Sequence, residues 1–209
     1  MEKEKRIDRR ILKSQDAIRN ALIDLIEEKG FDAISVSDIT ARANINRGTF
    51  YLHYRDKFDL LEKTEDAILD RFNRILMGSE GISIETYYTE KSPVPVIVSL
   101  FAYIKEHARM MHALLGVESK LGLQSRIKRT IEKNLFSLGY FPEKAATELT
   151  LPADYLISYI GAAHMGVVQT WLQNDCRESP EEMADMLARM SFYGPFQVVR
   201  NATGKSVAG

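Results

Sequence analysis

Apolar residues recur at helical spacing along most of this 209-residue chain. Between Asp16 and Lys29 they are three or four positions apart and so share one helix face: Ala17, Ile18, Ala21, Leu22, Leu25 and Ile26. Gly30 follows, and glycine commonly ends a helix in the left-handed conformation. The pattern predicts an amphipathic helix that ends at Gly30.

Shorter helices are predicted next. Ser37 is expected to cap a helix of about two turns that stops at Asn44, because a serine side chain can accept from free backbone N–H groups. Asn44 suits a tight turn, since asparagine tolerates the left-handed region. Asn46 is expected to cap a third helix through Tyr54, and Asp56 a fourth. This pattern fits a helix-turn-helix, although a plain helical hairpin shares it.

The third predicted helix decides between these two readings. Phe50 and Tyr54 are four residues apart and share one face, which can anchor the helix. Arg47, Gly48 and Thr49 form its first turn, and the first turn of a recognition helix meets base edges in the DNA major groove. The arrangement favours a helix-turn-helix. Arg47 is expected to read a base, or else to pair with a neighbouring acid, and Thr49 to contact a thymine methyl or a phosphate.

The rest of the chain is also predicted to be helical. The stretch after Pro95 is typical of two helices with a bend near His107, and an amphipathic helix is expected to end at Gly139. Two last helices are expected over about Pro152–Asn174 and Ser179–Phe192, the second with Ser179 as cap and Glu182 in a capping box. Residues 79–95 show only a weak strand signal, typical of either a loop or a pocket lid.

Two binding surfaces are hypotheses from this second half. A stretch of small residues flanked by apolar ones predicts a dimer interface, or else an internal core helix, at Gly161, Ala162, Gly166, Val167 and Trp171. Aromatic and methionine stripes with a few polar tips suggest an effector pocket, or else plain core, at Phe72, Phe101, Tyr103, Met110, Tyr155, Tyr159 and His164.

Composition and charge narrow the class of protein. The formal net charge is −1, so a nucleic-acid surface must be a local patch. Residues 1–13 hold six basic and three acidic side chains, which suits either a solvated end or extra DNA contacts from Arg9, Arg10 or Lys13. No apolar run approaches the roughly 20 residues of a membrane helix. With one cysteine and no apolar leader segment, a cytoplasmic protein without membrane contact is expected.

Catalytic and metal chemistry find little support in the sequence. Cys176 lies in a polar stretch without a nearby histidine, whereas a reactive thiol needs a base or an electropositive setting. His107 and His112 are five apart and diverge by about 140° on a helix. No glycine-rich phosphate loop appears. We therefore expect no enzyme, no cofactor and no metal site.

The segment "KGFDAISVSDITARANINRGTFYLHYRDKFDLL" resembles the TetR family of bacterial transcriptional regulators. The matching positions are Gly30, Phe31, Ile39, Ala43, Gly48, Thr49, Tyr51, Tyr54, Lys57 and Leu61. Asn44 departs from the family's usual glycine, a mild change given its tolerance of the left-handed region. The resemblance is looser around "YIGAAHMGVVQTWLQNDCRESPEEMADML".

The resemblance implies an all-α homodimer that binds double-stranded operator DNA and a small-molecule effector. Residues 1–57 would form the helix-turn-helix domain, 58–200 the helical effector-binding and dimerisation domain, and 201–209 a disordered tail. Tyr51, His53 and Lys57 match phosphate-contacting positions, and Lys57 also lies where helix N–H groups can face an anion. The complete DNA-binding prediction is Ser37, Asn46, Arg47, Gly48, Thr49, Tyr51, His53 and Lys57.

A repressor released by its effector is the function that the resemblance favours, acting on a pseudo-palindromic site. A DNA-binding regulator without an effector remains an alternative, because nothing in the second half of the sequence excludes it.

Overall fold

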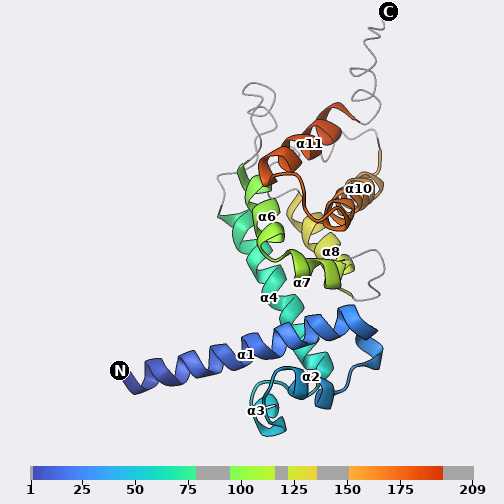
Figure 1. Cartoon of the computed structure of the whole chain (residues 1–209). Coiled ribbons are helices and arrows are strands. Elements are labelled where there is room, and N and C mark those ends of the chain that lie inside the picture. The colour runs from blue at the N-terminus through green and yellow to red at the C-terminus, as the bar shows by residue number, and fades with distance from the viewer. Residues whose placement is uncertain (1, 79–94, 116–121, 136–150, 195–209) are drawn as a thin grey trace, which may run out of the picture. The chain divides into compact units, whose positions relative to one another are not determined.

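The computed structural model describes residues 2–78, 95–115, 122–135 and 151–194, with backbone alone at 2–10, 131–135 and 153 (Figure 1). Within these ranges every regular element is a helix, which confirms the predicted all-α class. None of the described helices is both long enough and apolar enough to cross a membrane. The chain divides into two compact units, Met1–Ile68 and Leu69–Gly209, and the division falls inside a helix.

The first unit contains the predicted helix-turn-helix elements. They are α1 (Glu2–Lys29), the short 3-10 turn η1 (Phe31–Ala33), α2 (Val36–Arg42), α3 (Arg47–Tyr51) and the start of α4 (Lys57–Met77). The helix α1 begins well before the expected Asp16, because residues 2–15 contain neither glycine nor proline and are rich in helix formers. The predicted contacts of Arg9 and Arg10 lie outside the described side chains.

Both predicted turn residues adopt the left-handed conformation. Gly30 has φ 72° and Asn44 has φ 52°. The Gly30 N–H donates to the Ile26 carbonyl at 2.9 Å, which ends α1. The Asn44 turn then allows α2 and α3 to pack against each other, as the pattern predicts.

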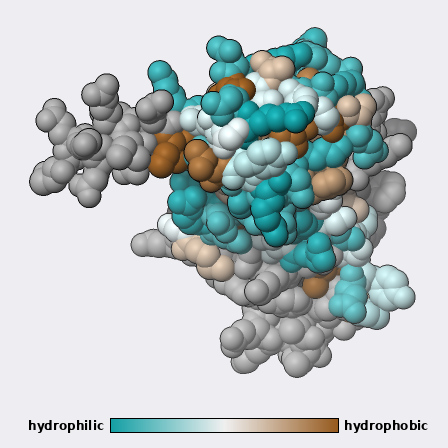
Figure 2. All heavy atoms as spheres, turned by 90° about the horizontal axis from the view of Figure 1, so that it is seen from below, coloured by the Kyte–Doolittle hydropathy of each residue, from teal (hydrophilic) through white to brown (hydrophobic). Residues whose placement is uncertain are grey.

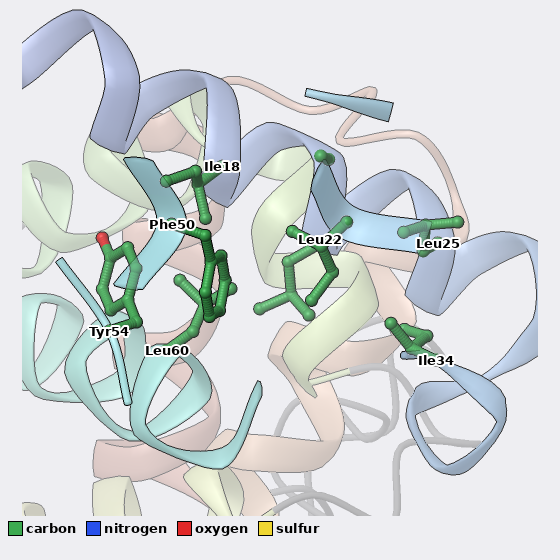
Figure 3. Packing of buried hydrophobic residues seen from close by; sticks show 9 residues of the cluster. Ile18, Leu22, Leu25, Ile34, Phe50, Tyr54 and Leu60 are labelled. Atoms are coloured by element: carbon green, nitrogen blue, oxygen red, sulfur yellow. The ribbon is translucent and has the colours of Figure 1, made fainter. Parts of the chain in front are cut away.

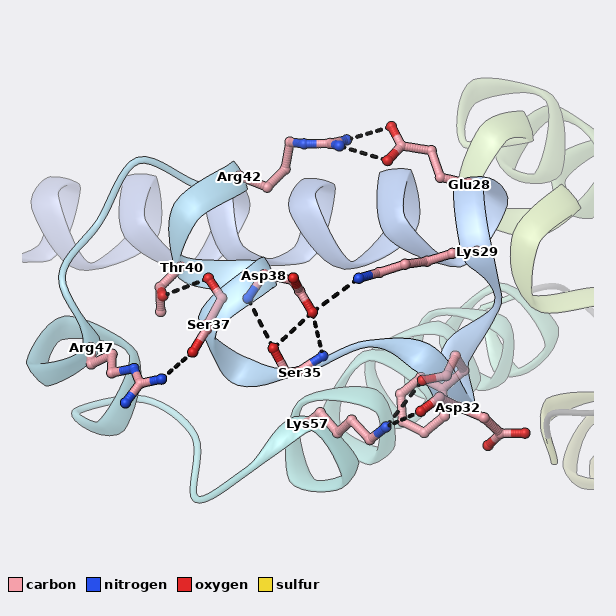
Figure 4. Close-up of polar contacts among 11 residues, drawn as sticks. Glu28, Lys29, Asp32, Ser35, Ser37, Asp38, Thr40, Arg42, Arg47 and Lys57 are labelled. Carbon is pink, nitrogen blue, oxygen red and sulfur yellow. Dashed lines mark hydrogen bonds and ion pairs between the residues drawn. The ribbon is translucent and has the colours of Figure 1, made fainter.

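The cap of α2 is Ser35, and the prediction of Ser37 is wrong. The Ser35 hydroxyl accepts from the Asp38 N–H at 3.2 Å, and the Asp38 carboxylate accepts from the Ser35 N–H at 2.8 Å. Asp38 stands three residues after Ser35, which is the spacing of a capping box. Ser37 is instead a residue of the first helical turn, between these two partners (Figure 4).

The core of the first unit joins all its helices (Figure 3). Ile18, Leu22 and Leu25 on α1 meet side chains from η1, α2, α3 and α4. Phe50 and Leu60 are fully buried within this cluster. Burying a large apolar side chain contributes roughly 1.5–3 kcal/mol, so this cluster holds α3, which is too short to be stable alone.

The second unit contains the remainder of α4, then α6 (Pro95–Glu106), α7 (Ala108–Leu115), α8 (Leu123–Leu135), α10 (Ala153–Gln173) and α11 (Pro180–Tyr193). Within it, α6 packs on α11, while α10 packs on α7 and α8. The predicted bend near His107 is confirmed as the break between α6 and α7.

Predicted helix ends in the second unit fare differently. The Ser179 capping box is confirmed: the Ser179 N–H donates to Glu182 at 2.7 Å, and the Glu182 N–H donates to Ser179 at 3.1 Å. Pro152 stands at the cap position, one residue before α10. The predictions for residues 79–94, the helix end at Gly139 and the tail 201–209 lie outside the described residues.

The two serines of α2 should differ in their effect on stability. Ser35→Ala removes the cap and is expected to cost about 1 kcal/mol in the free energy of unfolding. Ser37→Ala removes no cap and should leave that free energy nearly unchanged. Urea unfolding followed by circular dichroism measures both values, and a larger loss for Ser37→Ala would contradict the assignment of Ser35.

Candidate nucleic-acid interface

The predicted anchor residues Phe50 and Tyr54 are both buried, although α3 ends at Tyr51 and not at the expected Tyr54, which lies three residues beyond the helix. Phe50 is 0% exposed and Tyr54 is 6% exposed, and their ring centroids lie 5.7 Å apart. Burial also raises the pKa of the Tyr54 hydroxyl, because the charged phenolate would lose its hydration. The two rings anchor α3, so the opposite face is presented in one orientation.

The first turn of α3 lies at the surface. Asn46, Arg47 and Gly48 are exposed. The Asn46 carboxamide oxygen accepts from the Thr49 N–H at 2.7 Å, which confirms the predicted cap, and from the Thr49 hydroxyl at 3.0 Å. The Thr49 hydroxyl is therefore bonded to the cap residue. Of this side chain, only the methyl group would be left to contact a base.

Tyr51 is 56% exposed on α3, and its ring packs edge-to-face with Phe50 at a centroid distance of 5.5 Å. Figure 2 looks onto the side of the first unit that carries α2 and α3, and hydrophilic residues dominate it. Ile11 and Leu12, where the described side chains of α1 begin, are large apolar residues that are also exposed.

Arg47 reaches across the turn to α2. Its guanidinium donates to the Ser37 hydroxyl, so the first residue of α3 is joined to the first turn of α2 (Figure 4). The structure therefore brings together two of the predicted DNA-binding residues.

Lys57 has structural partners that the sequence did not predict. Its ammonium donates to the carbonyls of Phe31 at 3.1 Å and Asp32 at 3.0 Å, and it lies 4.8 Å from the Phe31 ring centroid. These contacts join η1 to α4 and use two of its three N–H groups. Asp56 accepts from two N–H groups at the start of α4, at 2.9 and 2.8 Å, and so occupies the predicted anion position.

Asp59 is a structural residue that sequence reasoning missed. It is 6% exposed and accepts from the Arg55 N–H at 2.9 Å and from Lys63 at 3.0 Å. Lys63 also donates to the His53 carbonyl at 3.1 Å, which fixes the exit from α3. The Arg55 N–H, followed by Lys63, lowers the Asp59 pKa to about 2. The i, i+4 spacing of Asp59 and Lys63 in the sequence could have indicated this ion pair.

A second unpredicted contact fixes α2 on α1. The Arg42 guanidinium donates to both Glu28 carboxylate oxygens, at 2.7 and 2.6 Å (Figure 4). This two-point geometry restricts the angle between the helices more than a single bond does.

The predicted effector residues do not form one group. Phe101 packs edge-on against Trp171, with ring centroids 5.2 Å apart. Phe72 packs against Tyr103, with ring centroids 5.7 Å apart. Tyr155 and Tyr159 are 75% and 61% exposed on α10, away from any buried cluster.

The two remaining effector candidates lie partly buried. Met110 is half-buried on α7. His164 Nε2 lies 3.0 Å from the Ser191 hydroxyl, and burial lowers the His164 pKa to about 4.

The predicted dimer residues divide between two sides of α10. Gly161 is buried, and a Cβ there would meet the Lys128 side chain at 3.4 Å, so this glycine serves the packing of α8. Trp171 is 2% exposed in the protomer's own core. Ala162 and Gly166 are exposed, with open space around Gly166, and Val167 is half-buried. Only the exposed set is available to a partner.

Groups that could do metal or thiol chemistry are not assembled in the described part of the chain. It contains no group of three or more His, Cys, Asp or Glu side chains with metal-binding geometry. Cys176 is buried, and burial raises the pKa of its thiol, which disfavours the reactive thiolate.

Comparison with known proteins adds an independent line of evidence. Residues 18–64 match the family described as "Bacterial regulatory proteins, tetR family", and residues 91–193 match "Transcriptional regulator C-terminal region". An "uncharacterized HTH-type transcriptional regulator", YxbF of Bacillus subtilis (strain 168), is 47% identical over 62 residues, 29% of this chain and 16% of that protein.

Another relative is IcaR of Staphylococcus aureus (strain Newman), named as the biofilm operon icaADBC negative transcriptional regulator. It is 30% identical over 69 residues, which span 33% of this chain and 37% of IcaR. The chain thus aligns with less than half the length of either relative.

Solved structures share the fold over most of the chain. A TetR transcriptional regulator from Streptococcus agalactiae 2603V has a TM-score of 0.60 at 22% identity, covering 88% of this chain and 96% of that one. The fatty acid degradation regulator FadR from Bacillus halodurans has a TM-score of 0.61 at 19% identity, covering 84% and 93%. At these identities the likeness concerns the fold alone.

The depressed pKa of Asp59 predicts a pH-dependent contribution to stability. Asp59→Asn removes the charge, so wild type should exceed the variant in melting temperature most clearly above about pH 4, the ordinary range of Asp ionisation. The difference should shrink as the pH falls through the folded pKa of about 2. Calorimetry of both proteins across this range measures it, and a difference independent of pH would contradict the contact's role.

Proposed function

This chain belongs to the TetR family of bacterial transcriptional regulators, and we propose that it represses transcription as a homodimer bound to a pseudo-palindromic operator, which it releases when a small effector binds. The observation that carries the proposal is the burial of Phe50 on α3 and of Tyr54 just after it, while Arg47 and Gly48 of α3 are exposed. A helix fixed in this way can present one polar edge to a DNA groove.

Base reading is assigned to the first turn of α3. A guanidinium can donate two bonds to guanine O6 and N7 in the major groove, a contact worth roughly 1–3 kcal/mol of discrimination. Gly48 carries no side chain and lets the backbone come close to the DNA. The Thr49 methyl group can contact a thymine methyl, since its hydroxyl donates to the Asn46 cap.

Phosphate contacts are assigned to the edges of the same surface. The exposed Tyr51 can donate its hydroxyl to a phosphate oxygen. The half-buried His53 lies next along this edge, and Lys57 keeps one N–H group beyond its two carbonyl acceptors. Contacts of this kind position the protein on the duplex without reading its sequence.

Repression is proposed because one relative, IcaR, is named as a negative transcriptional regulator. The alignment with IcaR covers 33% of this chain. In a family whose members bind operators, a protein that occupies promoter DNA can block transcription directly.

The proposed dimer interface is the exposed face of α10 together with α11. Tyr155, Tyr159, Ala162 and Gly166 follow each other three or four residues apart and are all exposed, so they form one stripe. On α11, Met186 and Tyr193 are 38% and 41% exposed. Large exposed apolar side chains beside small ones fit a packed helix interface. A dimer would place two α3 helices about one DNA turn, roughly 34 Å, apart or a multiple of it.

The proposed effector site lies around the aromatic residues of α4 and α6. Phe72 meets Tyr103, and Tyr103 meets His107 at a centroid distance of 4.6 Å. The helix α4 holds Lys57 at one end and Phe72 near the other, so it contains residues of both units. A ligand that displaces Phe72 can therefore act on the DNA-binding unit through one continuous helix, with a coupling of roughly 1–3 kcal/mol.

Two variants of α3 should separate base reading from phosphate contact. The probe is the duplex that the wild-type protein enriches from a random-sequence pool, with a scrambled duplex as control. Arg47→Ala should lose roughly 1–3 kcal/mol on the enriched duplex and much less on the scrambled one. Tyr51→Phe, which keeps the ring, should weaken both duplexes by about the same factor.

Fluorescence anisotropy gives the four dissociation constants at one salt concentration. If Arg47→Ala weakens both duplexes equally, base reading belongs to another residue. If the wild-type protein enriches no sequence, the proposal of operator binding is wrong.

The dimer face predicts the effect of a charge at Gly166. Gly166→Arg meets open space within one protomer, so the protomer should fold. In a dimer it would bury an unpaired charge, which is strongly unfavourable. Light scattering at micromolar concentration should give twice the chain mass for wild type and one chain mass for the variant. Gly122→Arg, at another glycine with open space, is the matched control and should remain dimeric.

A further inference from the structure

The contact between Arg47 and Ser37 links the two helices of the helix-turn-helix through a residue proposed to read bases. Arg47 is the first residue of α3, and Ser37 lies in the first turn of α2. The guanidinium Nη2 donates to the Ser37 Oγ (Figure 4). An exposed arginine at the start of a five-residue helix would otherwise sample many rotamers.

Ser37 is itself held in place. It lies between Ser35 and Asp38, which exchange two hydrogen bonds at 2.8 and 3.2 Å. The Ser37 carbonyl accepts from the Thr40 hydroxyl at 3.1 Å, and the neighbouring Ile39 is 0% exposed. The backbone that carries the Ser37 hydroxyl is therefore held against the core of the first unit.

The chemistry of the contact leaves Arg47 able to bind DNA. A guanidinium has five N–H donors, and guanine takes two of them. The acceptor here is a neutral hydroxyl rather than a carboxylate, so the positive charge of Arg47 is not neutralised. An acidic partner would reduce the attraction to DNA, whereas a hydroxyl restricts the side chain without that loss.

We propose that Ser37 is a positioning residue for Arg47: its hydroxyl fixes the guanidinium and so determines which base pair Arg47 reads. This rests on the proposed function. Restricting a long side chain before binding reduces the rotamer entropy lost on contact with the base. Ser37 thus contributes to sequence preference through Arg47 and needs no contact with the DNA of its own.

A double-mutant cycle tests the proposal. Wild type, Ser37→Ala, Arg47→Ala and the double variant are each measured on the enriched duplex and on its scrambled control. Ser37→Ala should lower affinity for the enriched duplex by roughly 3- to 10-fold, the usual effect of one hydrogen bond, and leave the scrambled duplex nearly unaffected. In the Arg47→Ala background the same change should have no further effect, because the two residues act as one unit.

A second readout follows the base preference directly. Enrichment from the random pool is repeated with Ser37→Ala and with Arg47→Ala. Both variants should lose preference at the same base position of each half-site. Ser37→Thr retains the hydroxyl and should restore the wild-type preference and affinity.

Several outcomes would overturn the proposal. If the effects of Ser37→Ala and Arg47→Ala add, or if Ser37→Ala weakens both duplexes equally, Ser37 contacts phosphate directly or acts only on folding. The proposal also fails if Ser37→Ala changes neither affinity nor preference. If wild type enriches a sequence and only the cycle fails, the proposed function stands without this inference. If wild type enriches none, the proposed function itself fails.

Discussion

The burial of Phe50 and Tyr54 is the constraint on which the DNA-binding surface depends. Helix α3 has five residues, and a helix of that length has no stability of its own in water. Its position comes from the two rings that enter the core formed by Ile18, Leu22 and Leu60 (Figure 3). Because Phe50 and the nearby Tyr54 are buried, the exposed residues of α3 are held in one orientation, and these are the residues proposed to contact DNA.

Polar contacts add to the packing of the core, and they involve Lys57 and the first N–H groups of α4, which the sequence analysis assigned to DNA phosphates. The Lys57 ammonium joins η1 to α4, while Asp56 takes the free N–H groups of α4. The Arg42 and Glu28 pair fixes α2 on α1, and Asp59 holds the exit from α3. These charged groups therefore hold the helices of the first unit in position. A small set of exposed residues remains for DNA recognition.

Local features were predictable from the sequence because each depends on a few neighbouring residues. The anchor pair Phe50 and Tyr54, the left-handed Asn44 and the cap at Asn46 are of this kind. The cap of α2 was misplaced because two serines stand two residues apart, and only the Asp38 partner distinguishes Ser35.

Contacts between distant segments were not predictable in the same way. The second unit shows this at α10, which is apolar on several sides. Its periodicity could not tell that Gly161 faces α8 while Gly166 faces open space. The partners of Lys57 lie 25 and 26 residues away and have no signature in sequence spacing. Tyr155 and Tyr159 were placed with buried aromatics by type, although their positions on α10 leave them exposed.

Hydrogen–deuterium exchange of the protein, with and without its enriched duplex, tests whether the helix-turn-helix binds DNA. Backbone amides of the α2–α3 region, residues 36–56, should exchange more slowly when DNA is bound, because α3 is proposed to enter the major groove. Amides of α10 and α11 should change far less at protein concentrations that keep the dimer intact. Slower exchange confined to α10 and α11, with residues 36–56 unchanged, would contradict the account.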